Sequence, residues 1–334
     1  MTNHRVVASM KTDARPDTIV IALGGNAFQT KGDKGTAEEY WRNAYTAADL
    51  IVRLVEEKYG VVVTHGNGPQ VGIIAEWMSL GLKNKNIPPM PLDVAGAMSQ
   101  GWLGYMLQQA LYNKLAEKKL LGSLVKGVVT VITQTLVDRN DPAFKDPTKY
   151  IGPWYEKDEA EKLSKELGWV FKPDPRGGYR RVVASPDPIG QVEIDAIKTL
   201  VEQGFIVIAD GGGGIPVYRG DDGLLHGVEA VIDKDLGAER MASALEADVL
   251  LILTDVEKAY LNYGTPNAKP LDVLRVSEAL KYYREGHFKP GSMGPKILAG
   301  VRFVQNGGKM AVIAHLKQAY DALKGNAGTR IIPD

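Results

Sequence analysis

The stretch IVIALGGNA, from Ile19 to Ala27, decides the fold, because an apolar, β-branched run breaks there into two glycines and an asparagine. Comparable apolar runs recur at 18–23, 60–65, 127–133, 205–210, 249–255 and 309–315. Runs of this length predict strands of a parallel sheet that is buried on both faces. Segments with apolar residues at steps of three and four alternate with the runs, as in 36–58. The alternation predicts a doubly wound α/β sandwich.

The composition narrows the class of protein. The chain has 334 residues with 40 basic and 40 acidic side chains, so its formal net charge gives no reason to expect contact with nucleic acid or an anionic membrane. No apolar run approaches the roughly 20 residues that span a bilayer, and 1–17 look like a loose extension rather than a secretory signal. Cysteine is absent, which excludes disulfides, thiolate metal sites and a cysteine nucleophile. We therefore expect a cytoplasmic protein with no membrane contact.

The rhythm of strands and helices breaks between Gln134 and Pro188. This region is rich in proline and aromatic residues, and its single helical pattern is EKDEAEKLSKELGW, at 156–169. A segment of this length without strand periodicity is more often an added subdomain or lid than a plain loop. The composition leaves both interpretations open, a subdomain and a surface insertion without a role.

Four glycine clusters lie beside predicted strands or helices. They are GGNA at 24–27, HGNGPQVG at 65–72, GGGGIP at 211–216 and GSMGPK at 291–296. Ligands of open α/β sheets bind beyond the carboxyl ends of the strands, where glycine lets backbone N–H groups approach an anion. Any one cluster is more often a tight turn, but four together predict a shared anion site. The chain has no GxxxxGK[ST] loop, and Pro216 breaks the dinucleotide fingerprint, so a Walker-type loop and an NAD site are both disfavoured.

Charged residues beside the glycines are the second indication of a phosphate site. Asp233, Lys234 and Asp235 follow an apolar run, and Lys296 stands where a helix should begin. A lysine among glycines can balance phosphate oxygens, and an adjacent carboxylate can orient the ammonium group or hold a metal. The alternative for each lysine is a solvated surface position. His65 alone of the histidines lies in a glycine cluster, where it either hydrogen-bonds a substrate oxygen or braces the loop.

Seven motifs, taken in order, resemble the carbamate kinases, a branch of the amino acid kinase family. They are ALGGNA, THGNGPQVG, SQGWLGY, GYRRVVASPDP, GGGGIP, AVIDKDL and GHFKPGSMGPK. The resemblance runs from Thr18 to the C-terminus, and the ordered set is far more specific than any single motif.

The resemblance implies a three-layer αβα sandwich with a central, mostly parallel sheet, assembled as a homodimer. It implies reversible phosphoryl transfer, ATP + carbamate = ADP + carbamoyl phosphate, used for ATP synthesis, with Mg²⁺ carried by the nucleotide and no organic cofactor. The N-terminal lobe, 18–198, would hold the small substrate, and the C-terminal lobe, 199–334, the nucleotide. The region 134–188 would be the protruding subdomain that distinguishes carbamate kinases.

Site residues carry over from the family position by position. Those expected around the phosphoryl group and the small substrate are Gly24, Gly25, Asn26, His65, Gly66, Asn67, Gly68, Gly212, Gly213 and Gly214. Those expected at the nucleotide are Asp255, Lys258, Tyr263, Gly291, Met293 and Gly294. Lys234 and Lys296 match two lysines that contact phosphate, and Asp235 matches the acid that positions them. Lys149 is similar to a subdomain lysine that reaches the carbamoyl end, and Arg139 is a weaker candidate for that role.

Many relatives in the wider amino acid kinase family carry a lysine where this chain has Ala22, so the positive charge is expected from the distant lysines, and this difference narrows the resemblance to the carbamate kinases. Two positions depart from the carbamate kinase pattern. Asp210 precedes the four glycines where a small residue is usual, and Tyr150 follows Lys149 where proline is usual. A carboxylate beside a phosphate site is unfavourable unless it is turned away or binds a metal.

Two other functions stay open on the sequence. A sibling kinase that acts on an amino-acid carboxylate would share the fold, and a non-catalytic, nucleotide-sensing dimer is the alternative from another class. Retention of both lysines and all four glycine clusters argues against a sensor, which needs no second substrate pocket. An NAD-dependent oxidoreductase is a distant third.

Overall fold

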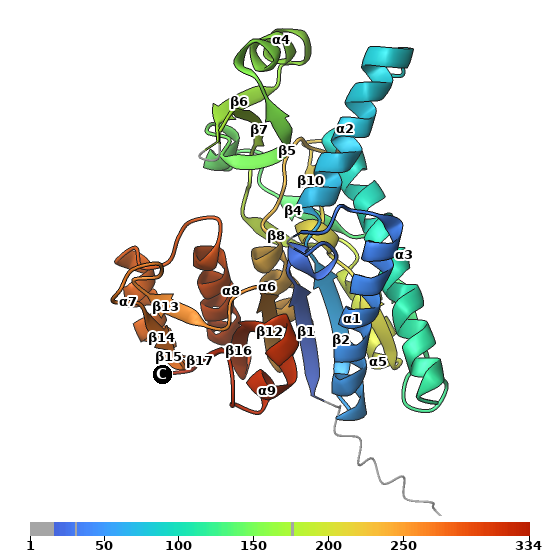
Figure 1. The fold of residues 1–334 in the computed structure, drawn as a ribbon. Helices are drawn as coiled ribbons and strands as arrows, with labels where there is room; N and C mark the ends of the chain where they lie inside the picture. The colour runs from blue at the N-terminus through green and yellow to red at the C-terminus, as the bar shows by residue number, and fades with distance from the viewer. Residues whose placement is uncertain (1–16, 31, 175–176) are drawn as a thin grey trace, which may run out of the picture.

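An eight-stranded sheet forms the centre of the molecule (Figure 1). The computed structural model describes residues 17–30, 32–174 and 177–334, so the predicted extension lies outside it except for Asp17. In spatial order the strands are β15 (Val273–Arg275), β17 (Thr329–Ile332), β16 (Met310–His315), β12 (Val249–Thr254), β1 (Thr18–Leu23), β2 (Gly60–His65), β9 (Phe205–Ile208) and β3 (Gly127–Thr130). Within this sheet, β16 and β17 pair antiparallel and every other neighbouring pair is parallel.

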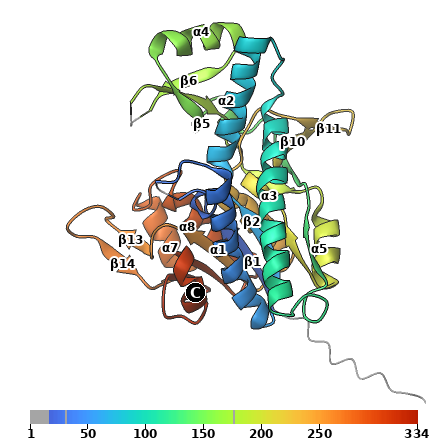
Figure 2. The same ribbon diagram turned by 45° about the vertical axis from the view of Figure 1, so that its right-hand side comes forward.

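Helices cover both faces of this sheet (Figures 1 and 2). On one face lie α1 (Ala37–Glu56), α3 (Leu92–Glu117) and α9 (Ala319–Leu323), and on the other α5 (Ile194–Glu202), α6 (Lys234–Ala244), α7 (Val276–Arg284) and α8 (Met293–Gln305). The side chains of β1 alternate between the two cores, as the period of a strand requires. Leu23 packs with α1, whereas Ala22 is fully buried with α6 and α8. The predicted αβα sandwich is confirmed.

Local signals place the ends of several elements. The N-terminus of α1 is a capping box, in which Glu39 N–H donates to Thr36 Oγ1 and Thr36 N–H donates to the Glu39 carboxylate. Two predicted strands end at least two residues early. The strand from 127–133 stops at Thr130, and Thr133 N–H donates to the side chain of Gln100 instead of a neighbouring strand. The strand from 205–210 stops at Ile208, because Asp210 has a left-handed backbone with φ 56°.

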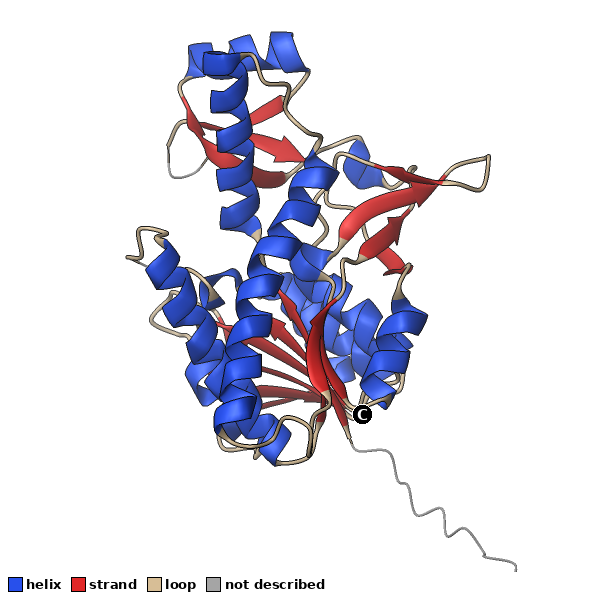
Figure 3. Cartoon of the chain, turned by 90° about the vertical axis from the view of Figure 1, so that its right-hand side faces the viewer, coloured by secondary structure: helices blue, strands red, loops and turns tan. Residues whose placement is uncertain are grey.

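The region 134–188 is richer in strands than the periodicity of its sequence suggests. One four-stranded sheet has the order β11 (Leu225–Gly227), β10 (Ile215–Arg219), β4 (Gln134–Val137) and β8 (Pro188–Gln191). One three-stranded sheet has the order β5 (Lys149–Tyr155), β7 (Tyr179–Val183) and β6 (Val170–Pro173), with α4 (Lys157–Leu167) against β6 and β7. Strands this short, interrupted by proline, give no long apolar run. We call β5, β6, β7 and α4 the protruding sheet, because these elements stand apart from the main sandwich (Figures 1 and 3).

The remaining elements connect these parts. They are α2 (Gly68–Lys85), the hairpin of β13 (Ala259–Leu261) and β14 (Lys269–Leu271), and the 3₁₀ helices η1 (Gly25–Ala27), η2 (Pro142–Phe144), η3 (Gly211–Gly213) and η4 (Leu316–Gln318). Within the described ranges, no helix combines the length and apolar character needed to cross a membrane.

Candidate active site

Three of the glycine clusters meet beyond the carboxyl ends of β1, β2 and β9. A β-carbon added to Gly66 would lie 2.9 Å from the backbone nitrogen of Gly25 and 3.3 Å from Cδ of Lys234. A β-carbon on Gly212 would lie 2.1 Å from Nδ2 of Asn67. The loops therefore pack so closely that a side chain at Gly66 or Gly212 would collide with its neighbours.

The backbone of the third loop also requires glycine. Gly212, Gly213 and Gly214 have φ values of 73°, 89° and 86°, a region that other residues rarely occupy. Gly68 begins α2, so the N-terminus of that helix lies at the same edge of the sheet. Asn26 lies in η1, but its side chain is not among those that the structure describes.

Two lysines converge on one carboxylate at this edge. Lys234 and Asp235 are the first two residues of α6, and Lys296 lies in the first turn of α8. The Nζ atom of Lys234 is 2.5 Å from Oδ1 of Asp235, and the Nζ atom of Lys296 is 2.8 Å from Oδ2. We call these three residues the lysine–aspartate cluster. The cluster carries a formal charge of +1. It brings together the two lysines expected to contact phosphate and the acid expected to position them.

Burial and mutual attraction set the ionisation of the cluster. Burial alone would raise the pKa of Asp235, but the two ammonium groups outweigh it and hold that pKa well below its usual range. Burial lowers the pKa of Lys234, although Asp235 opposes the shift. Burial would also lower the pKa of Lys296, but attraction to Asp235 is stronger and raises it. The cluster is thus a fixed pair of cations around one anion.

Lys149 reaches the same region from the protruding sheet. Its Nζ atom is 3.2 Å from Oδ2 of Asp233, which is the N-cap of α6. Arg139 is not brought to the cluster, because its guanidinium group lies over the ring of Tyr218, 5.7 Å from the centroid. Tyr150, the departure beside Lys149, donates its hydroxyl hydrogen to the carbonyl of Pro173 within the protruding sheet.

His65 lies beneath the loops and is fully enclosed. Its ring meets Phe28 edge-on at 5.5 Å, and a β-carbon on Gly211 would lie 2.7 Å from its Nε2. Burial lowers the pKa of His65 to about 4, so the ring is neutral at physiological pH. The sequence left two roles open for His65, a hydrogen bond to substrate and structural support of the loop. A neutral, tightly packed ring fits the second role.

Asp210 turns its carboxyl group into the protein. Its Oδ1 accepts hydrogen bonds from Thr135 Oγ1 at 3.0 Å and Gln191 Nε2 at 3.1 Å, both from the four-stranded sheet. Burial raises its pKa to about 7, and the two hydrogen bonds limit the shift. This orientation satisfies the condition under which a carboxylate is tolerated near a phosphate site.

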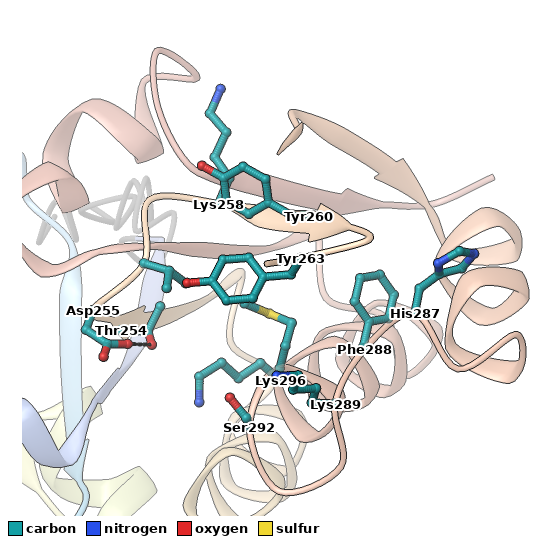
Figure 4. A pocket seen from close by; sticks show the side chains of 12 residues that line it. Thr254, Asp255, Lys258, Tyr260, Tyr263, His287, Phe288, Lys289, Ser292 and Lys296 are labelled. Atoms are coloured by element: carbon teal, nitrogen blue, oxygen red, sulfur yellow. Dashed lines mark hydrogen bonds between the residues drawn. The ribbon is translucent and has the colours of Figure 1, made fainter. Parts of the chain in front are cut away.

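A cavity of about 200 Å³ opens between the β12 end, the β13–β14 hairpin and the start of α8 (Figure 4). Of the residues predicted for the nucleotide, Asp255, Lys258, Tyr263 and Met293 line it, as does Lys296. Gly291 and Gly294 do not line it. They shape the turn before α8, where Gly291 has φ 71° and Gly294 N–H donates to the carbonyl of Lys289.

Sequence reasoning missed part of this wall. The additional lining residues are Thr254, Val256, Tyr260, His287, Phe288, Lys289 and Ser292. The motif GHFKPGSMGPK contains His287, Phe288 and Lys289, which come shortly before Gly291. These three residues could therefore have been predicted from the motif. Tyr260 became recognisable only in the structure, where its ring centroid lies 5.6 Å from that of Tyr263.

No group of three or more metal-binding side chains is found among residues 17–30, 32–174 and 177–334. Asp235 of the cluster and the neighbouring Asp233 both accept from lysine ammonium groups.

Known proteins resemble this chain over almost its whole length. The sequence profile of the amino acid kinase family matches residues 17–315. The chain belongs to the amino acid kinase family. Two similar relatives are carbamate kinases. The carbamate kinase of Pyrococcus horikoshii is 55% identical over 95% of this chain and 100% of its own length. The carbamate kinase of Clostridium perfringens is 48% identical over 94% of this chain and 99% of its own length. Carbamate kinase from Giardia lamblia, solved with AMP-PNP bound, has a TM-score of 0.89 and 43% identity, covering 96% of this chain and 99% of its own.

Proposed function

We infer that the protein is a carbamate kinase, which transfers a phosphoryl group reversibly between ATP and carbamate. The observation that carries this function is the lysine–aspartate cluster at the glycine-lined edge of the sheet, in a chain that matches a carbamate kinase over 95% of its length. Phosphoryl transfer passes through a loose transition state, so the enzyme must align donor and acceptor and stabilise spread negative charge. Carbamate is already an anionic nucleophile, and no covalent intermediate is required.

We assign the roles around the transferred group as follows. The loops 24–26, 66–68 and 212–214 present backbone to the phosphoryl oxygens, and Lys234 and Lys296 supply the charge. Asp235 keeps the two ammonium groups in register, because it contacts both. Lys149 reaches the carbamoyl end of the substrate. The neutral ring of His65 holds the loops.

We place the nucleotide in the cavity beside Tyr263. Tyr263 is 55% exposed, and an exposed aromatic ring at a cavity rim suits contact with a purine. Lys296 belongs to both the cavity wall and the cluster, so the phosphates of a nucleotide bound there would point toward the transfer site. The Giardia relative was solved with AMP-PNP bound, which supports nucleotide binding by this chain. Mg²⁺ enters as part of the nucleotide substrate, neutralising the phosphates.

The decisive experiment measures ATP formed from ADP and carbamoyl phosphate, with and without Mg²⁺. We expect Mg²⁺-dependent synthesis of ATP and no phosphorylation of acetylglutamate or aspartate. Phosphorylation of either amino-acid carboxylate in place of carbamate would point to a sibling kinase. ADP binding without transfer to or from any of these compounds would point to a sensor.

We also propose a cytoplasmic homodimer that associates through α3. Four large apolar side chains share the exposed face of this helix at helical spacing: Val94, Met98, Tyr105 and Tyr112. Such a stripe on the surface is typical of a subunit interface. Figure 2 shows α3 running along the outside of the sandwich.

A further inference from the structure

The segment 229–233 ties the protruding sheet to the start of α6. At one end, Glu229 pairs with Arg181 of β7 and accepts a hydrogen bond from Leu92 N–H at 3.0 Å. In the middle, Val231 N–H donates to the carbonyl of Ala184, the residue that follows β7. At the other end stands Asp233. This five-residue segment therefore contacts the protruding sheet at one end and joins the first residues of the lysine–aspartate cluster at the other.

Asp233 uses its two carboxylate oxygens for different partners. Oδ1 accepts from the backbone N–H of Asp235 at 3.0 Å and so caps α6, while Oδ2 pairs with Nζ of Lys149 at 3.2 Å. One carboxylate therefore holds both the first turn of α6, which includes Lys234, and the lysine that comes from β5.

The two partners differ in how firmly they are held. The Asp233 side chain is 15% exposed and bonded to the backbone, whereas the Lys149 side chain is 32% exposed on a flexible four-carbon stem. The carboxylate is the fixed member of the pair, and it restricts where the Lys149 ammonium group can be.

We propose that Asp233 is a positioning residue, which sets Lys149 in register with the lysine–aspartate cluster and so with the carbamoyl end of the substrate. The proposal rests on the function inferred above and on the role assigned to Lys149. It adds a link between the protruding sheet and the phosphate site that passes through a single side chain.

Two substitutions separate the functions of Asp233. Asn caps a helix about as well as Asp but has one oxygen, so Asp233→Asn keeps the cap and turns an amide toward the Lys149 ammonium group. Asp233→Ala loses both contacts. We expect Asp233→Asn to raise the KM for carbamoyl phosphate about tenfold, as for loss of one charged hydrogen bond, with the KM for ADP within about twofold of wild type. Its thermal midpoint should match wild type, and that of Asp233→Ala should fall.

A double-mutant cycle with Lys149→Met tests the route of the effect. If Asp233 acts through Lys149, Asp233→Asn adds no further change in the KM for carbamoyl phosphate once Lys149 is replaced. A full additional increase in the double variant would overturn the proposal, and so would an unchanged KM in the Asp233→Asn variant of an active enzyme. Asp146→Asn is the matched control, since it breaks an exposed pair with Lys172 in the same region and should leave both KM values unchanged. Failure of the wild type to form ATP would refute the proposed function instead.

Discussion

At the scale of single residues, the proposed chemistry depends on two buried ammonium groups that share Asp235. Replacing either lysine by methionine keeps most of the side-chain volume and removes one charge from the transfer site. We expect Lys234→Met and Lys296→Met each to lower kcat by on the order of 100-fold to 1,000-fold, the usual cost of losing one preorganised donor. Steady-state kinetics of ATP formation measure this. Lys118→Met, which breaks an exposed pair with Glu56, is the control and should keep full activity. Full turnover in the Lys234→Met variant would remove Lys234 from the catalytic assignment.

The ionisation of Asp210 makes the free energy of unfolding depend on pH. Its pKa is about 7 in the folded protein because it is buried, against an ordinary value of 3.8 when unfolded. Between about pH 4 and pH 7 the folded protein keeps a proton that the unfolded chain has released, so the free energy of unfolding decreases as pH rises through this window. Asp210→Asn removes this contribution. We therefore expect the free energy of unfolding of the variant, measured in urea and relative to that of wild type, to increase by roughly 2 to 3 kcal/mol from pH 5 to pH 8. Identical pH dependence in the two proteins would contradict the raised pKa.

The residues differ in how far sequence could predict them. Lys234, Asp235 and Lys296 were each candidates from their local sequence, and the resemblance to the carbamate kinases gave them a shared role. The structure places their charged atoms within bonding distance of one another. The surroundings of Asp210 had no such signal. Thr135 and Gln191 come from two strands that the sequence did not reveal, and their approach to Asp210 is a product of tertiary packing.

At the scale of elements, a close glycine contact seats the protruding sheet on α2. A β-carbon on Gly72 would lie 3.3 Å from Cα of Gly152 in β5. We expect Gly72→Val to push β5 away from α2, which displaces Lys149 and raises the KM for carbamoyl phosphate several-fold. Gly81→Val places the same residue in the same helix, where the added β-carbon makes only an ordinary contact with Ile87. Equal effects of the two substitutions in kinetics would mean that helix propensity, and not this contact, is responsible.

Long buried elements were predictable and short ones were not. Runs such as 18–23 and 60–65 became β1 and β2 with the predicted bounds, because a strand buried on both faces must be apolar throughout. The strands of the protruding sheet are partly exposed and include proline, so their sequences lack that constraint. The pattern 156–169 still predicted α4, since its apolar positions follow a helical period.

At the scale of the whole molecule, the exposed face of α3 decides the oligomeric state we propose. Charges in the middle of an apolar interface are unpaired and desolvated on association, and they oppose it. We expect the double variant Met98→Glu, Tyr105→Glu to be a folded monomer by light scattering after gel filtration, with the wild type a dimer. Both side chains are about half exposed in the single chain, so circular dichroism should be unchanged. A wild-type monomer, or a variant that remains a dimer, would place the interface elsewhere.

The convergence of the loops and the lysine–aspartate cluster has a consequence for how the enzyme is made. The loops after β1 and β2 leave the ribosome early, but Lys234 and Lys296 follow only in the last third of the chain. A nascent chain therefore contains the loops after β1 and β2 well before it contains the two lysines that we assign to the phosphoryl group. We therefore expect a chain cut between Gly68 and Lys234 to leave neither piece with both the first two loops and the two lysines of the proposed centre.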